Sequence, residues 1–531
     1  MGGGLAVAAA IVAFGFIGSR LLGVLRTAAI ADAFGAEPEL DAWRVAFQIP
    51  DLIFQVLAGA TMGSAFIPVF ARLYKNESTE RAWYLASSVL TLVTIATAVL
   101  CAIAFIAAPV LVPLMAPGLG EGVDDPDALV DRAVFLTRIM LLSPLLFAVS
   151  GMLTGILNAR QQFFLPALAP MLYNLAIIAG AVVLSRPFGV EGLAIGVVVG
   201  AGLHLAVQVP GLIRERMRYR FLLDVKDAAT REVGRLMGPR ILGLAAVQLN
   251  LFITIFFASQ IGSGAIANMT YAFTIAQLPL ALFGMALSTA VFPRLADQMA
   301  DGDLAALHNT VSRVLRLIMF LTIPAAVGLA LLREPVTVLL LQGGAFGPGD
   351  AAVTAAALGW YCLGIVPLAG TEIHSRGFYA MGDTRTPVLM TLVALGVNVV
   401  VSALVWEPFG TQGLAFSVSL AAWAEWGLLS VLWVRRTRQP VLPDAQVIAR
   451  VAWAAALMAL VVGVLSAFFP SDARPTAAVA TVALTSAGAL VYAAMAMWLR
   501  LDEATSLLDR VLVKLRRGRG ETGEAKDEPP S

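Results

Sequence analysis

The chain has 531 residues, of which 59% are hydrophobic and only 13% are charged. Soluble globular domains carry about 25% charged residues, so the chain lacks the polar surface that several soluble domains would need. Lysine plus arginine (36) nearly balances aspartate plus glutamate (35), and the net charge of +1 argues against a nucleic-acid partner, whose phosphates bind basic surfaces. The composition therefore predicts an integral membrane protein.

Apolar runs long enough to cross a bilayer as helices recur along the whole chain. A spanning helix needs about 20 mainly apolar residues, and by this criterion we predict an all-α protein with fourteen transmembrane helices. Prolines at Pro50, Pro144, Pro279 and Pro367 predict bends in these helices. The predicted spans are 5–31, 42–72, 82–115, 130–158, 164–185, 191–213, 237–260, 264–297, 311–333, 351–379, 387–406, 412–434, 447–469 and 476–499.

Basic residues gather in alternate connections between the predicted spans. The loops 72–81, 214–235 and 435–450 carry clusters of arginine and lysine. By contrast, residues 32–40 contain no lysine or arginine, and residues 118–131 are acidic. Because lysine and arginine near membrane spans stay on the cytoplasmic side, we expect the basic loops and both termini to face the cytoplasm.

A repeat relates two parts of the chain. Pro166–Ala194 aligns without gaps with Pro387–Ala415, and the best matches cluster at one central turn. Each copy predicts a helix, a short outer turn and a second helix, so we expect the copies to superpose by a rotation about the membrane normal. We therefore predict two six-helix lobes and an appended pair of helices. The predicted divisions are an N-lobe at 1–220, a C-lobe at 221–440, helices 13 and 14 at 441–500 and a cytoplasmic tail at 501–531.

Two arginines, Arg20 and Arg26, lie well inside the first predicted span. A charge at the bilayer centre costs at least about 2.5–3.5 kcal/mol, so it is expected to face a watery cavity or the interior of a helix bundle. On one helix the two side chains would point about 120° apart, which suits the wall of a wide cavity. Guanidinium groups bind phosphate and carboxylate through paired hydrogen bonds, which indicates an anion-binding wall. Snorkelling of the side chains toward the interface is the alternative.

Three further charged positions have two interpretations each. Asp41 begins the second predicted span, where it is either the N-cap of that helix or a gate near the cavity mouth, and Arg44 could pair with it. Glu372 and Arg376 have the spacing of a neutralised pair on one helix. His374 between them is either a packing residue or a proton relay.

Asn398 and Ser402 lie four residues apart on predicted helix 11, and Asn250 on predicted helix 7 could join them. Oxygen ligands suit a hard cation, but three neutral groups without a carboxylate favour hydrogen bonds between helices. The sequence contains no phosphate-binding loop motif and no plausible nucleophile–histidine–acid set, and its two cysteines and three histidines indicate no metal cluster. We therefore expect neither an enzyme nor a cofactor.

Several motifs resemble the MurJ (MviN) family of lipid II flippases. In chain order they are Ser19–Arg26, Ala33–Ala36 with Asp41-Ala42, Ala46–Pro50, Ala65–Val69, Ala116–Gly118, Leu157–Ala167 and Gly377–Pro387. The resemblance implies the fold of the multidrug/oligosaccharidyl-lipid/polysaccharide exporter superfamily. It also implies transfer of lipid-linked peptidoglycan precursor from the inner to the outer leaflet of the bacterial cytoplasmic membrane by alternating access. On this resemblance Arg20 and Arg26 are cavity arginines, and Asp41 is the acid of the outer gate.

The chain departs from the family pattern at positions on helices 2 and 8 that usually carry charge. These positions hold Gln48, Phe54, Gly59, Thr274 and Gln277. Two alternatives to a lipid II flippase therefore remain: an exporter of another polyprenyl-linked glycan or drug, and a non-transporting scaffold that recruits cell-wall synthesis proteins. In each case the expected partners include membrane lipids.

Overall fold

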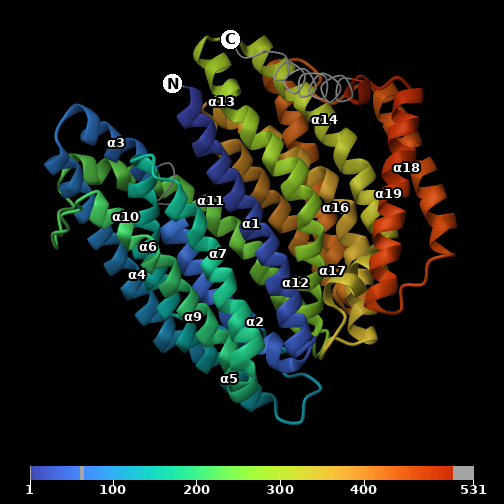
Figure 1. Cartoon of the computed structure of the whole chain (residues 1–531), viewed down its shortest axis with the longest axis horizontal. Coiled ribbons are helices and arrows are strands. Elements are labelled where there is room, and N and C mark those ends of the chain that lie inside the picture. Colours follow the sequence, from blue (N-terminus) through green and yellow to red (C-terminus); the bar gives the residue numbers. More distant parts are fainter. Residues whose placement is uncertain (1, 60–64, 506–531) are drawn as a thin grey trace, which may run out of the picture. The chain divides into compact units, whose positions relative to one another are not determined.

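The computed structural model describes residues 2–59 and 65–505, and Figure 1 labels their helices. The described part is helical apart from its connections, one of which contains an isolated β-bridge between Gly343 and Phe346. The helices are α1 (Gly2–Phe34), α2 (Pro38–Ile53), α3 (Ile67–Asn76), α4 (Thr79–Met115), α5 (Pro126–Met140), α6 (Leu142–Ala159), α7 (Phe164–Ala179), α8 (Ser185–Phe188), α9 (Glu191–Ala206), α10 (Val209–Arg214), α11 (Ala228–Ser259), α12 (Ala265–Pro279), α13 (Ala286–Ala300), α14 (Leu304–Leu331), α15 (Arg333–Leu341), α16 (Pro348–Ala380), α17 (Arg385–Thr437), α18 (Ala445–Ser466) and α19 (Arg474–Trp498).

Eleven helical segments in the described part are long and apolar enough to cross a membrane. This confirms the expectation of an all-helical membrane protein. The eleven segments do not correspond one to one with the fourteen predicted spans. α17 alone covers two predicted spans and is interrupted at Gly410. The predicted span 42–72 also contains residues 60–64, which lie outside the described part. The number fourteen stays a prediction.

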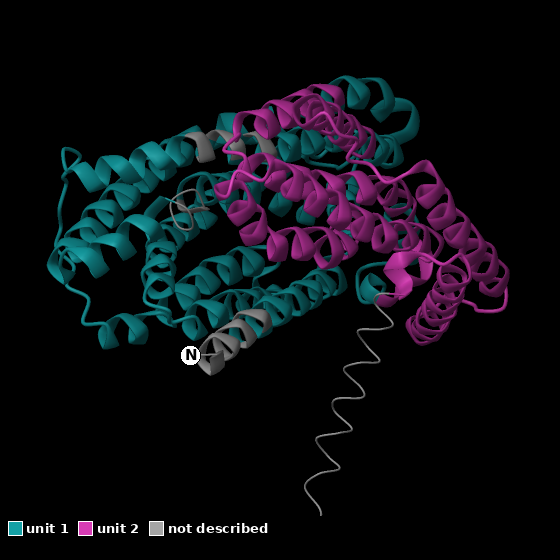
Figure 2. Cartoon of the chain, turned by 90° about the horizontal axis from the view of Figure 1, so that it is seen from above, with its two compact units in different colours: residues 1–271, 340–354, 398–417 teal, residues 272–339, 355–397, 418–531 magenta. Residues whose placement is uncertain are grey.

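The chain forms two compact units, which Figure 2 colours separately. Unit 1 comprises residues 1–271, 340–354 and 398–417. Unit 2 comprises residues 272–339, 355–397 and 418–531. A compact unit need not coincide with half of a sequence repeat, so the lobe boundaries at 220 and 440 stay predictions.

In unit 1, small residues let helices approach closely. α1 packs along α7, where Gly15 lies against Ala167 and the Asn174 side chain donates a hydrogen bond to the Ser19 carbonyl (3.3 Å). α7 in turn packs against α9, and there a Cβ on Gly196 would lie 3.1 Å from the backbone of α7. Small residues at such contacts are typical of membrane helices, whose association depends on close van der Waals packing.

The loops of unit 1 contact one another in two groups that match the predicted sides of the membrane. Among the loops predicted to lie outside, residues 32–36 bond to 343–346, and residues 116–120 bond to 259–264. Among those predicted inside, the ends of the 72–81 loop form ion pairs with residues 227 and 232. No contact in either group joins a predicted outer loop to a predicted inner one. The orientation of the two groups in the membrane stays a prediction.

In unit 2, the fully buried Trp433 organises the packing of α14, α16 and α17. Its indole N–H donates to His308 Nδ1 (3.1 Å), and its ring lies 5.8 Å from the ring of His374. His374 is completely buried, which agrees with the packing interpretation of this residue. α18 and α19 pack against each other and on α14, where the Tyr492 hydroxyl donates to the Phe320 carbonyl (2.7 Å). The predicted appended pair of helices thus corresponds to α18 and α19.

The two copies of the repeat share local backbone geometry. Gly189 has φ 56° and ψ −138°, and Gly410, at the matching position, has φ 54° and ψ −137°. The next matched pair, Gly192 and Gly413, also agrees, because in each case a Cβ would lie 2.5 Å from the backbone of the preceding helix. The turn therefore requires glycine at both positions of both copies. The rotation that relates the copies stays a prediction.

Two of the four predicted proline bends are followed by irregular helix. α2 continues past Pro50 into a π-helical turn at Phe54–Gly59, and Pro279 directly precedes a π-helical turn at Leu280–Met285. π-Helical turns are rare and occur often at functional sites. α16, in contrast, is continuous through Pro367.

Replacement of Gly189 or Gly410 with alanine tests the shared turn. A side chain at positive φ with ψ near −137° is strained, so each variant is expected to lose about 1–3 kcal/mol of stability. The two losses are expected to be similar because the backbone angles are nearly the same. Thermal unfolding of the purified chain in detergent measures them. Gly427→Ala is the control, since Gly427 is helical and has open space around a Cβ; equal midpoints for all three variants would contradict the assignment.

Candidate substrate site on helix 1

The two arginines of α1 occupy different surroundings. Arg20 is exposed, and its guanidinium lies 5.2 Å from the ring centre of Phe16, one turn earlier on the same helix. Arg26 is half-buried and shares a helix face with Gly15 and Ser19, which pack on α7. The structure therefore separates the two guanidinium groups onto different faces of α1, in line with the predicted angle between them.

Polar groups of three other helices of unit 1 lie around Arg26. Its charge interacts electrostatically with Asp51 and Arg44 of α2 and with Tyr173 of α7. Asp51 is held from the opposite side, because the Gln248 amide of α11 donates to its Oδ2 (3.1 Å). Arg26 thus lies near an acidic, a phenolic and a second basic side chain of unit 1.

Asp41 caps a helix far away in sequence. Its side chain is 3% exposed, and its carboxylate accepts hydrogen bonds from the backbone N–H groups of Gly264 (2.7 Å) and Ala267 (2.8 Å) at the start of α12. The interpretation of Asp41 as N-cap of its own helix is wrong, because α2 already begins at Pro38. A carboxylate is stabilised at a helix N-terminus by unpaired N–H groups and by the helix dipole, so this bond fastens α2 to α12.

The backbone around Asp41 is closely packed. Gly264 has φ 79°, and a Cβ there would lie 2.1 Å from the Ala36 carbonyl oxygen, so the turn before α12 requires glycine. Tyr271 of α12 donates a hydrogen bond to the carbonyl of Gly35 (3.0 Å). Arg44 does not form the suggested ion pair with Asp41. Its guanidinium stacks 5.4 Å from the Tyr271 ring centre and acts on Asp41 only through longer-range electrostatics.

The three candidate cation ligands do come together in unit 1. The Asn398 amide donates to Asn250 Oδ1 (2.5 Å), and the Ser402 hydroxyl donates to Asn398 Oδ1 (3.2 Å). Ser417 completes the cluster, since its hydroxyl donates to Asn398 Oδ1 (2.8 Å) and lies 2.7 Å from Ser402 Oγ. The cluster contains no carboxylate. Its amide and hydroxyl groups bond to one another, as expected for a contact between helices.

Two residues of these clusters were not predicted. Asp51 lies inside the second predicted span, so the cost of an intramembrane charge, which identified Arg20 and Arg26, applies to it equally. Ser417 gave no such signal, because serine is common in membrane helices and the residue lies 15 positions after Ser402. Only the return of the chain after the Gly410 turn brings the two hydroxyls together.

The positions at which the chain lacks the family's usual charges are filled differently. Gln48 is buried, with its Nε2 atom unpaired among the described residues. The Phe54 ring centre lies 4.7 Å from the ring centre of Phe147 of α6.

In unit 2, the predicted pair on α16 is present, since Arg376 Nη2 lies 3.3 Å from Glu372 Oε2.

Replacement of Asp41 tests its structural role. Asp41→Ala removes both acceptors from buried N–H groups and is expected to cost about 2 kcal/mol or more. Asp41→Asn keeps one acceptor oxygen and should lie between this variant and the wild type. Thermal unfolding of the detergent-purified chain is the measurement. The control is Asp303→Ala, which removes an exposed local cap on α14 (2.8 Å to the Ala306 N–H) and should cost about 1 kcal/mol. A midpoint for Asp41→Ala above that of Asp303→Ala would refute the role.

Comparison with solved structures shows the fold. The chain is similar to a structure described as lipid II flippase MurJ in an inward closed conformation, with a TM-score of 0.78 and 23% identity over 92% of this chain and 98% of that one. It is also similar to an inward-facing multidrug resistance MATE family transporter of the MOP superfamily, with a TM-score of 0.65 and 16% identity over 79% and 94% of the two chains. Both similarities confirm the expected superfamily fold.

Sequence comparison identifies the family. The model of the family described as lipid II flippase MurJ matches residues 30–487. The lipid II flippase MurJ of Burkholderia cenocepacia is 33% identical over 414 residues, which cover 76% of this chain and 79% of the relative. A probable lipid II flippase MurJ of Rhizobium meliloti is 30% identical over 495 residues, or 91% and 90% of the two chains. The chain therefore belongs to the MurJ family of lipid II flippases, a bacterial family of multi-pass membrane transporters rather than enzymes.

Proposed function

We propose that this chain moves lipid II from the inner to the outer leaflet of the bacterial cytoplasmic membrane by alternating access of its two lobes. The observation that carries the proposal is the family match over residues 30–487, which begins near the end of α1, four residues after Arg26, and includes Asp41. The proposed lobes are residues 1–220 and 221–440, each with six of fourteen spans. The contacts among the loops of unit 1 support a consistent sidedness, and the positive-inside rule then assigns both termini to the cytoplasm.

In this proposal Arg20 and Arg26 bind the diphosphate of the substrate. A diphosphate does not enter hydrocarbon unaided, and guanidinium groups replace its lost hydration with charge-assisted hydrogen bonds. Arg20 is exposed and has no acidic neighbour on α1 before Asp32, so its charge is available to an anion. Arg26 is half-buried within electrostatic range of Asp51, whose side chain accepts a hydrogen bond from the Gln248 amide.

Asp41 has a structural part in this proposal. It fastens the start of α2 to the start of α12, and breaking its two backbone hydrogen bonds would free the loops predicted to lie on the outer side. Asp41 thus fits a gate that holds the outer end of unit 1 closed. We assign the cluster of Asn250, Asn398, Ser402 and Ser417 to helix packing, because its polar groups bond to one another.

Complementation of a strain depleted of its own lipid II flippase tests the proposal. The wild-type chain should restore growth and the appearance of lipid II in the outer leaflet. Arg20→Ala and Arg26→Ala should each abolish both at unchanged protein abundance. Lysine at either position should rescue only partly, because a point charge lacks the planar fork of guanidinium. Arg435→Ala, at an exposed arginine in the last turn of α17 in unit 2, is the matched control and should complement fully.

Two outcomes would contradict the proposal in different ways. Normal growth of both alanine variants would favour a scaffold that retains the fold and recruits cell-wall synthesis proteins. Export of another polyprenyl-linked glycan or of a drug, without lipid II in the outer leaflet, would identify a different substrate for the same fold.

A further inference from the structure

The connection between α10 and α11 is an extended segment that lies along α4. Residues 217–224 have no regular secondary structure, and the chain enters them through a left-handed turn at Arg216 (φ 53°). We call residues 214–226 the strap. It lies within unit 1, so its contacts with α4 belong to one compact body.

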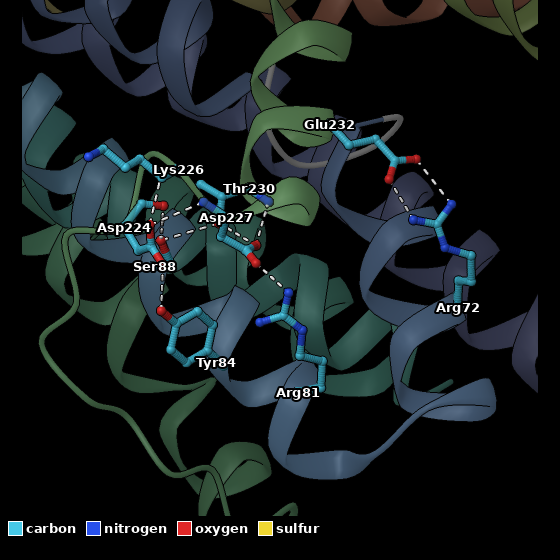
Figure 3. Close-up of polar contacts among 9 residues, drawn as sticks. All are labelled: Arg72, Arg81, Tyr84, Ser88, Asp224, Lys226, Asp227, Thr230 and Glu232. Carbon is cyan, nitrogen blue, oxygen red and sulfur yellow. Dashed lines mark hydrogen bonds and ion pairs between the residues drawn. The ribbon is translucent and has the colours of Figure 1, made fainter.

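α4 presents hydroxyl groups to the strap. Four residues of its first turns have the spacing of a single helix face: Tyr84, Ser87, Ser88 and Thr91. The Tyr84 hydroxyl donates to Asp224 Oδ2 (2.6 Å), and Ser87 Oγ accepts from the Arg220 backbone N–H (3.2 Å). These bonds use one carboxylate and the backbone of the strap, and none of them uses an arginine side chain; Figure 3 shows the bond between Tyr84 and Asp224.

Two ion pairs hold the chain just after the C-terminal end of the strap. Asp227 forms an ion pair with Arg81 and caps α11 by accepting from the Thr230 N–H (2.9 Å). Arg72 and Glu232 form a second pair (2.5 Å). The hydrogen bond from Arg72 lowers the pKa of the Glu232 carboxyl, so this pair is present at neutral pH and weakens only as the pH falls toward that lowered value. The two pairs therefore connect the start of α11 to the ends of the 72–81 loop.

The outer edge of the strap combines exposed cations with exposed apolar side chains. The cations are Arg214, Arg216, Arg218 and Arg220, all of them exposed. The large apolar side chains are Phe221, Leu223 and Val225, with 69%, 57% and 59% exposed. Arginine beside exposed aromatic and aliphatic groups is the composition of segments that lie in the interface of an anionic membrane.

The position of the strap along α4 fits this interface. α4 has 37 residues and is therefore about 55 Å long, whereas the hydrocarbon core is about 30 Å thick. The helix must extend well into at least one headgroup region. The strap occupies its N-terminal turns, up to the contact of Tyr219 with Thr91 (3.0 Å), and this is the end with the basic 72–81 loop.

We propose that the strap binds anionic phospholipid headgroups at the cytoplasmic surface of the membrane. Its arginines contact headgroup phosphates, and Phe221 and Leu223 insert among the headgroups. The proposal rests on the cytoplasmic orientation given under the proposed function. Arg214 ends α10, Arg216 lies in the left-handed turn, and Arg218 and Arg220 follow in the segment without regular structure, so the four charges are placed on different parts of the chain.

A fluorescent probe on the strap tests this binding in the full chain. Val225→Cys is labelled with an environment-sensitive fluorophore, while the native Cys101 and Cys362 are buried. The protein is placed in nanodiscs of phosphatidylcholine with increasing phosphatidylglycerol. The emission should shift to the blue as phosphatidylglycerol increases, nitroxide-labelled lipid should quench it, and high salt should weaken both effects.

Two triple variants that lose the same amount of charge distinguish lipid binding by the strap from a general effect of the net charge of the chain. In R216Q/R218Q/R220Q the mole fraction of phosphatidylglycerol at half-maximal shift should rise about five-fold or more, since each arginine near an anionic surface contributes to binding. R435Q/R438Q/R450Q, at the end of α17 and the start of α18 in unit 2, should behave like the wild type. Both variants leave the backbone bonds of the strap to α4 in place.

Three results would overturn the proposal. The first is an equal emission in discs with and without phosphatidylglycerol, and the second is an equal loss of the shift in both triple variants. The third is a shift produced by a polyprenyl diphosphate in pure phosphatidylcholine but not by phosphatidylglycerol, which would assign the strap to the substrate. The assay needs no transport, so a chain that binds phosphatidylglycerol but moves no lipid II would contradict the proposed function and leave the strap assignment intact.

Discussion

The cost of placing a charged side chain in hydrocarbon is the constraint on which the arrangement of unit 1 depends. Arg26 reduces this cost because it lies on the face of α1 that packs on α7, within electrostatic range of Asp51 and Tyr173. Asp41 reduces it by accepting hydrogen bonds from the backbone N–H groups at the start of α12. Arg20 differs, because its guanidinium is exposed and stacks only on Phe16. An exposed arginine within a membrane helix requires water or an anion beside it, and this requirement links the fold to the proposed substrate.

The sequence predicted those features that depend on local chemistry. Apolar runs gave the helices, and the repeat identified Gly189 and Gly410 as equivalent, which their backbone angles bear out. The cost of intramembrane charge identified Arg20 and Arg26, and the family resemblance agreed with the family match. The cap formed by Asp41 could not be predicted, because its partner Gly264 lies 223 residues later and no spacing rule joins them.

The first turns of α4 differ in polarity from the turns that follow them. The first turns of α4 carry hydroxyl groups that bind the connection to α11, and the following turns are apolar and suited to the bilayer. The strap is therefore bonded to the first turns of α4, and its arginines and large apolar side chains are exposed there. Sequence alone indicated only a basic loop on the cytoplasmic side. The contacts with Tyr84 and Ser87 are what fix which side chains point outward.

The central claim is that the guanidinium groups of α1 carry the diphosphate across the membrane. Its most direct test is the movement of fluorescent lipid II by the purified full chain in proteoliposomes, measured for the wild type, Arg26→Ala and Arg26→Lys. The account predicts movement by the wild type, partial movement by the lysine variant and none above protein-free vesicles by the alanine variant, at equal reconstitution. Equal rates for the wild type and Arg26→Ala would contradict it.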